Sequence, residues 1–374
     1  MSTPRIGIAG AGLLGRLLAW HFSRHGHEVH VFDPAPHPHP AHDGHGAAGF
    51  TAAGMLSPLA ELETAEPALA ALGWQSIAHW QAIAQCLGTP HTAPQVSQNG
   101  SLLVAHGADL GAARRMLAHL DRPAELQAAG FPANAHAQAL DAAALAALEP
   151  DLHGSSGPLH AWLLPGEGHI DTVASLQALH ADAQGVHWHW AQPVRDVTPG
   201  VVWPTQATTG APLHFDLVCD VRGVGARPSL PVRGVRGEVV WLHAPGVRLQ
   251  RPVRLLHPRH RVYIVPRPGD RVLVGASELE TEDRAPMTLR SAVELMAAAH
   301  SVLPGLAEAR ILRLDTNLRP ALPDHRPHVH TEAGLLRING LYRHGWLLAP
   351  ALAQQALQAL GLATLPGTAL VSPP

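Results

Sequence analysis

The sequence predicts an α/β fold in which a parallel strand–helix–strand unit is followed by a second domain of antiparallel strands. Two stretches indicate this fold: residues 5–33 read as strand, helix and strand, and residues 262–274 read as a β-hairpin. The chain has 374 residues, which is more than one hydrophobic core usually holds, so we expect two or three domains.

The composition is typical of a globular protein and gives no basis for binding nucleic acid. Hydrophobic residues make up 46% of the chain, charged residues make up 15%, and the net charge is −3 with the 28 histidines counted as neutral. The two cysteines, Cys86 and Cys219, offer neither a disulfide framework nor a CxxC metal site. No apolar run approaches the roughly 18 residues of a transmembrane helix and no signal peptide precedes Arg5, so we expect a cytoplasmic protein.

Residues 5–33, with the sequence RIGIAGAGLLGRLLAWHFSRHGHEVHVFD, justify the parallel unit. The apolar run 5–9 predicts a short strand, and leucines, an alanine and a phenylalanine then recur at helical spacing. Gly26 stands where a glycine commonly ends a helix, and the apolar residues of 29–32 predict a second strand that ends at Asp33.

Between the first strand and the helix lies G-x-G-x-x-G, the pattern of a loop that binds the pyrophosphate of a dinucleotide. Gly10 permits a tight turn, Gly12 lets the backbone approach a phosphate, and Gly15 lets the helix pack closely on the strand. The helix N-terminus offers free N–H groups to the phosphates. Asp33 can accept a ribose hydroxyl, and with Pro34 after it disfavours the 2′-phosphate of NADP, which leaves FAD and NAD.

Two further segments bear on the choice between these cofactors. Residues 49–61, GFTAAGMLSPLAE, are rich in Gly and Ala, which suits backbone that lies against a flat or bulky group, although a flexible loop is the alternative. Residues 260–277, HRVYIVPRPGDRVLVGAS, justify the antiparallel part, because a β-branched run and a second strand flank the turn 268–270. Tyr263 shares a face with Val265 in this hairpin, and simple packing on the sheet is the alternative to a functional role.

The segment ILRLDTNLRPALPD, residues 311–324, predicts a strand that ends at Arg319 and the proline after it. An arginine at a strand end can present its forked guanidinium to a carboxylate, and a structural ion pair with Asp315 or Asp324 is the alternative.

The segment 335–360 predicts a strand, a turn and an Ala/Leu-rich helix that begins near Gly345. The positive end of that helix would favour an anionic group such as a reduced flavin ring. We expect the tail, 363–374, to be frayed.

Together these segments resemble the glycine oxidase branch, of the thiamine-pathway type, in the D-amino acid oxidase family. The matching features, in family order, are GAGLLG at Gly10–Gly15, AAGM at Ala52–Met55, YIVPR at Tyr263–Arg267, the tripeptide Leu318-Arg319-Pro320, and RHGWLLAP from Arg343. The resemblance implies an FAD-binding Rossmann-like domain (1–85, 150–228 and 313–374) and an antiparallel-sheet substrate-binding domain (86–149 and 229–312).

The resemblance also implies a noncovalently bound FAD, a set of site residues and no metal. The residues implied to contact FAD are Gly10, Ala11, Gly12, Leu14, Gly15, Asp33, Thr51, Ala52, Ala53, Gly54, Met55, Val194, Arg343, His344, Gly345, Trp346 and Leu347. The substrate carboxylate would be bound by Arg319 and Tyr263, and the substrate amine by the backbone carbonyl of Arg343 and the backbone near Ser57. The chain departs from the family in two places, because Asp33 stands where Glu is commoner and Thr51 alone supplies a hydroxyl before AAGM.

The activity that the resemblance implies is the oxidative deamination of glycine or another small amino acid. Hydride would pass from Cα to flavin N5, the product would be an imine for thiamine thiazole synthesis, and O2 would be reduced to H2O2. The implied partners are the small amino acid and O2, without nucleic acid, and a homo-oligomer is possible. The alternative is a D-amino acid or sarcosine oxidase or dehydrogenase of the same fold that passes electrons to a quinone.

The stretch HPHPAHDGH, residues 37–45, does not fit this pattern and carries four histidines: His37, His39, His42 and His45. Its prolines disfavour regular structure, and the alternation of Pro and His turns neighbouring rings apart. We therefore expect an exposed loop rather than a metal site, and the sequence leaves open whether one ring contacts FAD.

Overall fold

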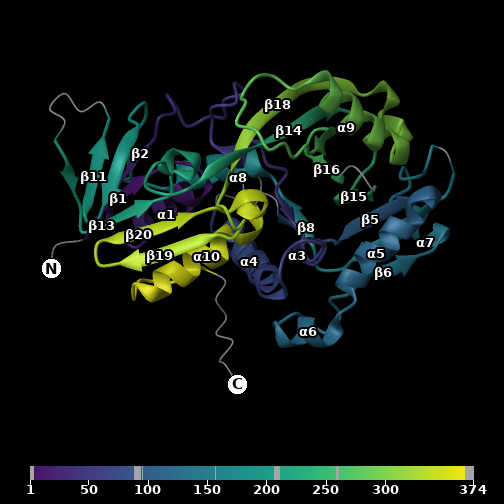
Figure 1. Cartoon of the computed structure of the whole chain (residues 1–374), viewed down its shortest axis with the longest axis horizontal. Helices are drawn as coiled ribbons and strands as arrows, with labels where there is room; N and C mark the ends of the chain where they lie inside the picture. Colours follow the sequence, from purple (N-terminus) through teal and green to yellow (C-terminus); the bar gives the residue numbers. More distant parts are fainter. Residues whose placement is uncertain are drawn as a thin grey trace.

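The computed structural model describes residues 4–87, 94, 96–155, 157–205, 211–257 and 261–366. It confirms the predicted α/β fold, with a mainly parallel sheet and a mainly antiparallel sheet towards opposite ends of the long axis (Figure 1). The strands β14 (Arg233–His243) and β18 (Arg310–Ala321) run between the two ends of the molecule.

The parallel sheet has six strands and confirms the predicted N-terminal unit. In spatial order the strands are β19 (His328–Glu332), β20 (Leu335–Asn339), β13 (Leu217–Asp220), β1 (Arg5–Ala9), β2 (Glu28–Phe32) and β9 (His187–His189). Only β19 runs antiparallel to its neighbour. Helix α1 (Leu13–Arg24) connects β1 to β2, and Gly26 follows it with φ +77°, as expected of a glycine that ends a helix. Cys219 is fully buried in β13, as expected of a small core residue.

The larger sheet has eight strands and contains the predicted hairpin. In spatial order the strands are β18, β14, β17 (Arg271–Gly275), β16 (Arg261–Arg267), β15 (Val253–Leu256), β5 (Ser101–His106), β7 (Leu159–Leu164) and β6 (Gln138–Leu140). Only β15 and β5 are parallel. The predicted strand end at Arg319 and Pro320 is wrong, because β18 continues to Ala321. Pro320 is tolerated because β18 is the edge strand of the sheet. β18 also crosses the predicted domain boundary at 313, and the domain bounds stay a prediction.

Two small sheets and the helices complete the described chain. One sheet holds β10 (Val194–Thr198), β11 (Val201–Pro204) and β12 (Leu213–His214), and the other holds β3 (Met55–Leu56), β8 (Gly168–Ile170) and β4 (Val96–Ser97). The remaining α-helices are α2 (Ala48–Thr51), α3 (Pro58–Glu61), α4 (Pro67–Cys86), α5 (Leu110–Leu120), α6 (Pro123–Ala128), α7 (Ala142–Leu148), α8 (Thr172–Asp182), α9 (Leu289–Val302) and α10 (Gly345–Ala359). Short 3₁₀ helices are η1 (Gly107–Asp109), η2 (Gly223–Ala226), η3 (Pro304–Glu308) and η4 (Tyr342–His344).

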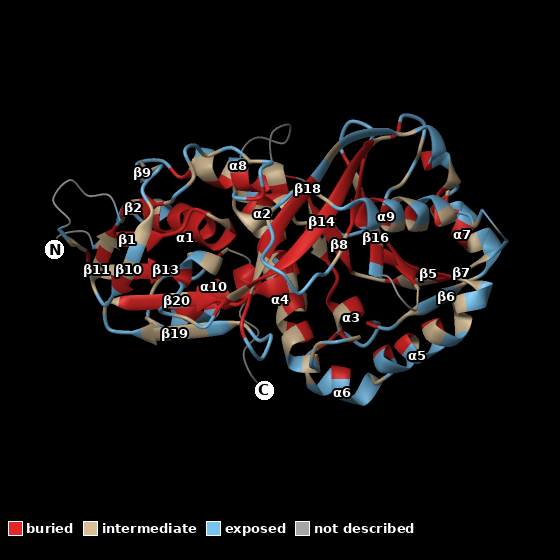
Figure 2. Ribbon diagram, turned by 45° about the horizontal axis from the view of Figure 1, so that its top comes forward, coloured by how far each residue is buried: buried red, intermediate tan, exposed pale blue. Residues whose placement is uncertain are grey.

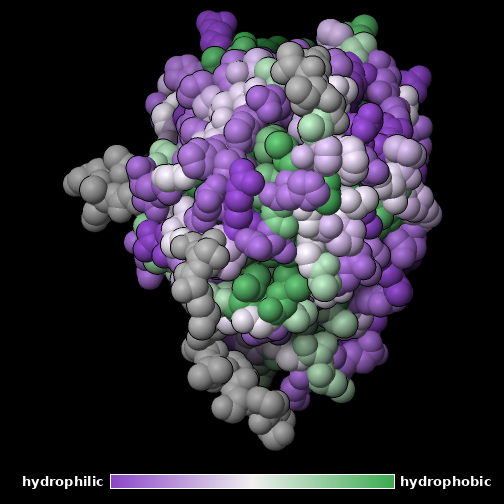
Figure 3. All heavy atoms as spheres, turned by 90° about the vertical axis from the view of Figure 1, so that its left-hand side faces the viewer, coloured by the Kyte–Doolittle hydropathy of each residue, from purple (hydrophilic) through white to green (hydrophobic). Residues whose placement is uncertain are grey.

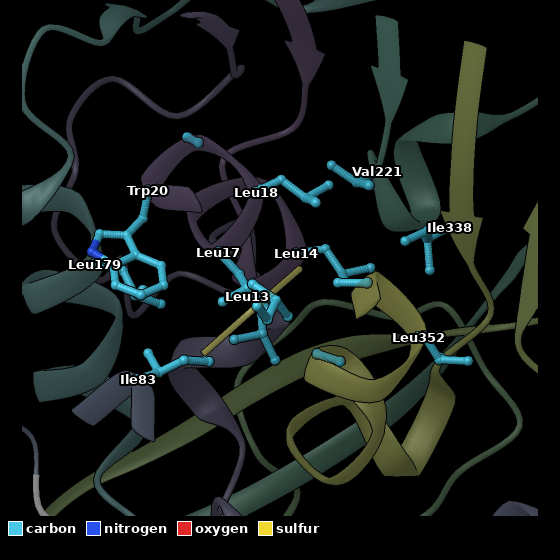
Figure 4. Close-up of a cluster of buried hydrophobic side chains, with 14 of the residues drawn as sticks. Leu13, Leu14, Leu17, Leu18, Trp20, Ile83, Leu179, Val221, Ile338 and Leu352 are labelled. Atoms are coloured by element: carbon cyan, nitrogen blue, oxygen red, sulfur yellow. The ribbon is translucent and has the colours of Figure 1, made fainter. Parts of the chain in front are cut away.

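The main core surrounds α1, which the apolar spacing of the sequence predicted. Figure 4 shows Leu17 and Leu18 of α1 among Ile83 of α4, Leu179 of α8 and Leu352 of α10. Each buried leucine contributes roughly 1.5–3 kcal/mol to folding. Figure 2 shows the same pattern for the whole chain, with buried residues in α1 and along both sheets, and exposed faces on α5 and α6. This core fixes α1 and therefore the glycine loop that precedes it.

The surface and the C-terminal segment give two further observations. The face in Figure 3 is mostly hydrophilic, with small hydrophobic patches between polar residues. Within the described ranges, no helix has the length and apolar character needed to cross a bilayer. The expectation of a frayed tail is wrong for residues 363–366, because the Leu365 side chain is buried and its N–H donates to Gln354 Oε1 at 2.7 Å. Residues 367–374 lie outside the described part.

Candidate active site

A cavity of about 890 Å³ is lined by residues of both large sheets, near the upper end of the roughly 300–1,000 Å³ usual for small-molecule sites. Four strands of the parallel sheet meet it at their carboxyl ends. Gly10 follows β1, Asp33 follows β2, Val221 follows β13, and Asn339 ends β20. Ligands of open parallel sheets bind at this edge, so the position of the cavity supports the predicted cofactor site.

The cavity brings most of the predicted site residues together. Those in its lining are Gly10, Gly12, Leu14, Asp33, Thr51, Ala52, Ala53, Gly54, Met55, Val194, Tyr263, Arg319, Arg343, His344, Gly345, Trp346 and Leu347. Three predicted residues do not line it: Ala11, Gly15 and Ser57. Ala11 instead donates its N–H to Asp33 Oδ2 at 2.6 Å, and Ser57 is buried immediately before α3. The roles implied for these three residues stay a prediction.

The three glycines of the motif have different surroundings. Gly10 has φ +103°, and a Cβ on it would lie 2.8 Å from the carbonyl oxygen of Val221. A Cβ on Gly15 would lie 1.8 Å from the Gly10 oxygen, so the fold itself requires this glycine. A Cβ on Gly12 would meet nothing nearer than Ala47 Cβ at 3.7 Å. Gly12 therefore leaves open space at the N-terminus of α1, where a phosphate would fit.

Asp33 is held by the backbone around it. Its two carboxylate oxygens accept N–H groups from Ala11 at 2.6 Å and Ala35 at 2.8 Å. Burial raises the pKa of Asp33, and these two N–H groups and Arg16 offset part of that rise. Each oxygen keeps a further lone pair, so the carboxylate can also accept a ribose hydroxyl.

The Gly/Ala-rich loop is anchored, which argues against the alternative of a flexible loop. Gly54 has φ +62°, and a Cβ on it would lie 2.3 Å from the backbone oxygen of Ile170. Arg267 donates to the carbonyl of Ala53, and Asn317 Nδ2 donates to Thr51 Oγ1 at 3.1 Å. The loop is therefore held in one place where it lines the cavity.

Tyr263 lines the cavity from β16, directly across from Arg254 on β15. Its ring fills the place where Gly275 has no side chain, since a Cβ there would lie 2.8 Å from the Tyr263 hydroxyl. Burial raises the pKa of Tyr263, although Arg319 and Arg254 lower it in part. The phenol therefore stays protonated and can donate to a carboxylate.

Arg319 is oriented by backbone oxygens. Its Nη1 donates to the carbonyl of Arg236 at 3.3 Å, and its Nη2 donates to the carbonyl of Ser277 at 3.1 Å. The guanidinium lies over Gly237, where a Cβ would lie 2.5 Å from Arg319 Cζ. These contacts fix the direction of the guanidinium and leave its charge available.

The alternative role of Arg319, a structural ion pair with a nearby aspartate, is wrong. Asp315 pairs with Arg313 at 2.7 Å and with His42 at 3.3 Å, and Asp324 accepts a backbone N–H. Within the described residues, Arg319 forms no ion pair with either aspartate.

Four charged or polar residues of the cavity lining escaped prediction from the sequence. Arg254, Glu61, Glu278 and Tyr342 all line the cavity. Arg254 Nη2 lies 3.1 Å from Glu61 Oε1, and the Tyr342 hydroxyl donates to Glu278 at 2.6 Å. Burial alone would raise the pKa of Glu61, but His344, Arg254 and a further arginine lower it to about 2. No local motif marks these residues, because each owes its position to contacts between distant segments.

The four histidines of residues 37–45 are all exposed, which confirms the expected loop. His45 lines the cavity, so it is the histidine of this loop that can approach a bound cofactor. Across the described ranges, no cluster of three or more His, Cys, Asp and Glu side chains is arranged to hold a metal.

Glu167 lies behind the site and carries a testable pH dependence. It is fully buried, accepts the N–H of Ala60 at 2.9 Å and the hydroxyl of Ser101, and has its pKa raised by burial to about 7. In the unfolded chain the pKa is about 4.3. The folded protein therefore holds a proton that the unfolded chain has lost, so the stability that Glu167 contributes is complete below about pH 4.3 and is lost as pH rises through about 7.

We expect Glu167→Gln to raise stability by about 3 kcal/mol at pH 8, with little change at pH 4.5, because glutamine mimics the protonated acid. Thermal unfolding followed by circular dichroism between pH 4.5 and 8 measures this difference. Glu125→Gln, at an exposed position of α6, is the control and should show no such trend. Parallel curves for wild type and Glu167→Gln would contradict the assignment.

The residues of this cavity fit FAD: Gly12 leaves room for a phosphate, Asp33 can accept a ribose hydroxyl, and anchored backbone lines the wall where a flat ring would lie. Comparison with known proteins agrees. The profile of the family described as FAD dependent oxidoreductase (DAO) matches residues 5–359.

Three relatives resemble the chain along most of its length. The oxidoreductase of Rhizobium etli that is assigned to thiamine biosynthesis (ThiO) is 38% identical, over 95% of this chain and 96% of its own. The crystal structure of glycine oxidase from Geobacillus kaustophilus is 25% identical, with a TM-score of 0.78 over 97% of both chains. The iminodiacetate oxidase of Chelativorans sp. BNC1 is 25% identical, with a TM-score of 0.77 over 96% of both chains. The chain therefore belongs to the FAD-dependent oxidoreductases of the DAO family.

Proposed function

We propose that this chain is a glycine oxidase that oxidises glycine or another small amino acid and supplies the imine for thiamine thiazole synthesis. One observation carries the proposal: Arg319, a guanidinium without an ion-pair partner among the described residues, lines the cavity together with the Tyr263 hydroxyl. This pair offers two donors and a positive charge that has no ion-pair partner among the described residues, which suits a single carboxylate.

The residues of the chain bind and orient, and the cofactor supplies the redox step. FAD held by the glycine loop and Asp33 would supply the acceptor for the hydride from Cα, and O2 would take up the electrons. Arg319 and Tyr263 hold the substrate carboxylate, and the carbonyl of Arg343 accepts a hydrogen bond from the substrate amine. Glu61, whose pKa is about 2, is too weak a base to deprotonate that amine, so the amine enters neutral.

The overall reaction balances without a further reductant. The amino acid loses one hydride and one proton to become an imine, and water converts the imine to a 2-oxo acid and ammonia. O2 takes up the two electrons and two protons as H2O2. The names of two relatives support this assignment, since one is a glycine oxidase and the other is assigned to thiamine biosynthesis.

The direct test is peroxide release by the purified protein with glycine, sarcosine, D-alanine and D-proline. We expect H2O2 with glycine or another member of this panel, in equal molar amount to the ammonia or methylamine formed, or to the cyclic imine from D-proline. The absence of turnover with all four amino acids would contradict the proposal.

Tyr263→Phe should raise KM for the amino acid by roughly 10- to 150-fold, because it removes a hydrogen bond to a charged group that is worth roughly 1.5–3 kcal/mol. The ring remains in place beside Gly275, so FAD content and melting temperature should not change. Steady-state kinetics measures the effect, and an unchanged KM would show that the hydroxyl does not meet the carboxylate.

A further inference from the structure

We propose that Glu61 is a specificity-determining residue that excludes amines carrying a second carboxylate. The inference rests on the proposed function, because it names the class of small amino acid that the same cavity accepts. It concerns a residue that no motif of the sequence marks.

Glu61 ends α3 and places a buried carboxylate in the cavity lining, with its side chain 12% exposed. Its Oε1 lies 3.1 Å from Arg254 Nη2, and its Oε2 lies 3.2 Å from His344 Nδ1 and 3.8 Å from Arg343 Nη2. The Glu61 carboxylate therefore contacts Arg254 on β15, next to Tyr263, and also Arg343 and His344 in η4. In the proposal, the first position lies beside the substrate and the second beside the cofactor.

The arginines around Tyr263 differ in whether an acid neutralises them. The lining includes Arg254, Arg261, Arg319 and Arg343. Three of them pair with a carboxylate: Arg254 with Glu61 at 3.1 Å, Arg261 with Glu63 at 3.3 Å, and Arg343 with Glu278 at 3.4 Å. Of these four, Arg319 alone forms no ion pair within the described chain, although its charge helps to lower the pKa of Glu278.

This charge balance fits a substrate with one carboxylate. A first carboxylate takes the free charge of Arg319 and the hydroxyl of Tyr263. A second carboxylate beside Glu61 meets Arg254 and Arg343, which already pair with acids, and would lie buried without a partner. Glu278 is 38% exposed on its side chain, so water screens it more than it screens Glu61.

Overall resemblance does not decide the question, because the glycine oxidase and the iminodiacetate oxidase resemble the chain equally well. Iminodiacetate is glycine with a carboxymethyl group on nitrogen, so the two named substrates differ by one carboxylate. The charges in the cavity therefore distinguish a substrate with one carboxylate from a substrate with two, which the fold does not.

The test compares two ligands that differ in one charge. Thiodiacetate replaces the amine of iminodiacetate with sulfur, so it carries two carboxylates and has no amine to be oxidised, and its monoamide carries one carboxylate at nearly the same size. Titration of each into the FAD-loaded protein, followed by the change in flavin absorbance, gives two dissociation constants. We expect the wild type to bind the monoamide at least about 10-fold more tightly than the diacid.

Four proteins form a cycle: wild type, Glu61→Gln, Arg254→Met and the double variant. The quantity compared is the ratio of the dissociation constants of the diacid and the monoamide. Glu61→Gln releases the charge of Arg254, so this ratio should fall by at least about 10-fold, in favour of the diacid. Adding Arg254→Met removes that charge and should restore the preference of the wild type. Arg254→Met alone should discriminate at least as strongly as the wild type. The matched control is Glu149→Gln, which alters another buried Glu–Arg pair, with Arg251 at 2.9 Å, outside the cavity lining and should leave the ratio unchanged.

Equal binding of both ligands by the wild type would overturn the proposal, as would an unchanged ratio in Glu61→Gln or a double variant that keeps the ratio of Glu61→Gln. If Glu61→Gln does not fold, the wild-type ratio and Arg254→Met decide, because weaker discrimination in Arg254→Met contradicts the proposal. Binding does not need turnover. A protein that discriminates but oxidises none of the four amino acids would therefore refute the proposed function alone.

Discussion

Replacing Arg319 with leucine is expected to lower kcat/KM for a small amino acid by roughly 30- to 5,000-fold while FAD remains bound. The change removes a desolvated charge contact worth roughly 2–5 kcal/mol, and most of the loss should appear in KM. The side chain contacts backbone carbonyls and the face of Gly237, so its removal breaks no ion pair among the residues that the structure describes. Steady-state kinetics, with the absorption spectrum as a measure of bound FAD, tests this expectation.

The matched control is Arg313→Leu on the same strand, because Arg313 pairs with Asp315 and does not line the cavity. Its kinetic constants should stay close to those of the wild type. If Arg319→Leu loses the flavin absorbance, Arg319 supports the cofactor site. If Arg319→Leu has the same KM for the amino acid as the wild type, the substrate carboxylate binds elsewhere.

Replacing Gly15 or Gly12 with alanine should have two different effects, a loss of stability in the first case and a loss of FAD affinity in the second. Gly15→Ala places a Cβ 1.8 Å from the Gly10 oxygen, so we expect a loss of roughly 3 kcal/mol or more of stability, through displacement of α1 from β1. Gly12→Ala finds open space and keeps an extended backbone with φ −74°, so the apoprotein should be as stable as the wild type. Its methyl group instead occupies the space expected for the pyrophosphate, and FAD affinity should fall at least about 10-fold.

Thermal unfolding of the apoproteins and titration with FAD separate these two effects. Gly111→Ala is the control, because its Cβ would have no neighbour nearer than 4.0 Å and it lies in the exposed helix α5. Alanine there should raise stability slightly, by up to about 1 kcal/mol. A stable Gly15→Ala protein, or a Gly12→Ala protein with the FAD affinity of the wild type, would contradict the interpretation of the glycine loop.

The features that could be predicted from the sequence are those that depend on neighbouring residues. Strand β1, the turn at Gly10 and helix α1 follow from apolar spacing and glycine positions within residues 5–33. The hairpin of β16 and β17 follows in the same way from a β-branched run and a Pro-Gly-Asp turn. Local patterns of this kind hold because hydrogen bonds and side-chain spacing act within a few residues.

Features that depend on distant contacts could not be predicted in the same way. The strand end expected at Arg319 was wrong because β14 pairs with β18 as far as Ala321, a contact that spans almost 90 residues. Glu61 and Arg254 were missed for the same reason, since 193 positions separate them and no motif contains both. The resemblance implied that the backbone near Ser57 holds the substrate amine; Ser57 itself is buried outside the cavity lining, and that role stays a prediction. Which acid pairs with which arginine in the cavity could therefore not be predicted before the fold was known.

The claim that this protein oxidises a small amino acid through FAD is tested most directly by adding glycine to the purified protein without oxygen. We expect a protein with flavin absorbance that fades when glycine or another small neutral amino acid is added. With no more than one equivalent of the amino acid for each flavin, admission of air should restore the absorbance and release one H2O2 for each flavin reduced. A protein whose flavin absorbance stays unchanged with glycine, sarcosine, D-alanine and D-proline would contradict the account.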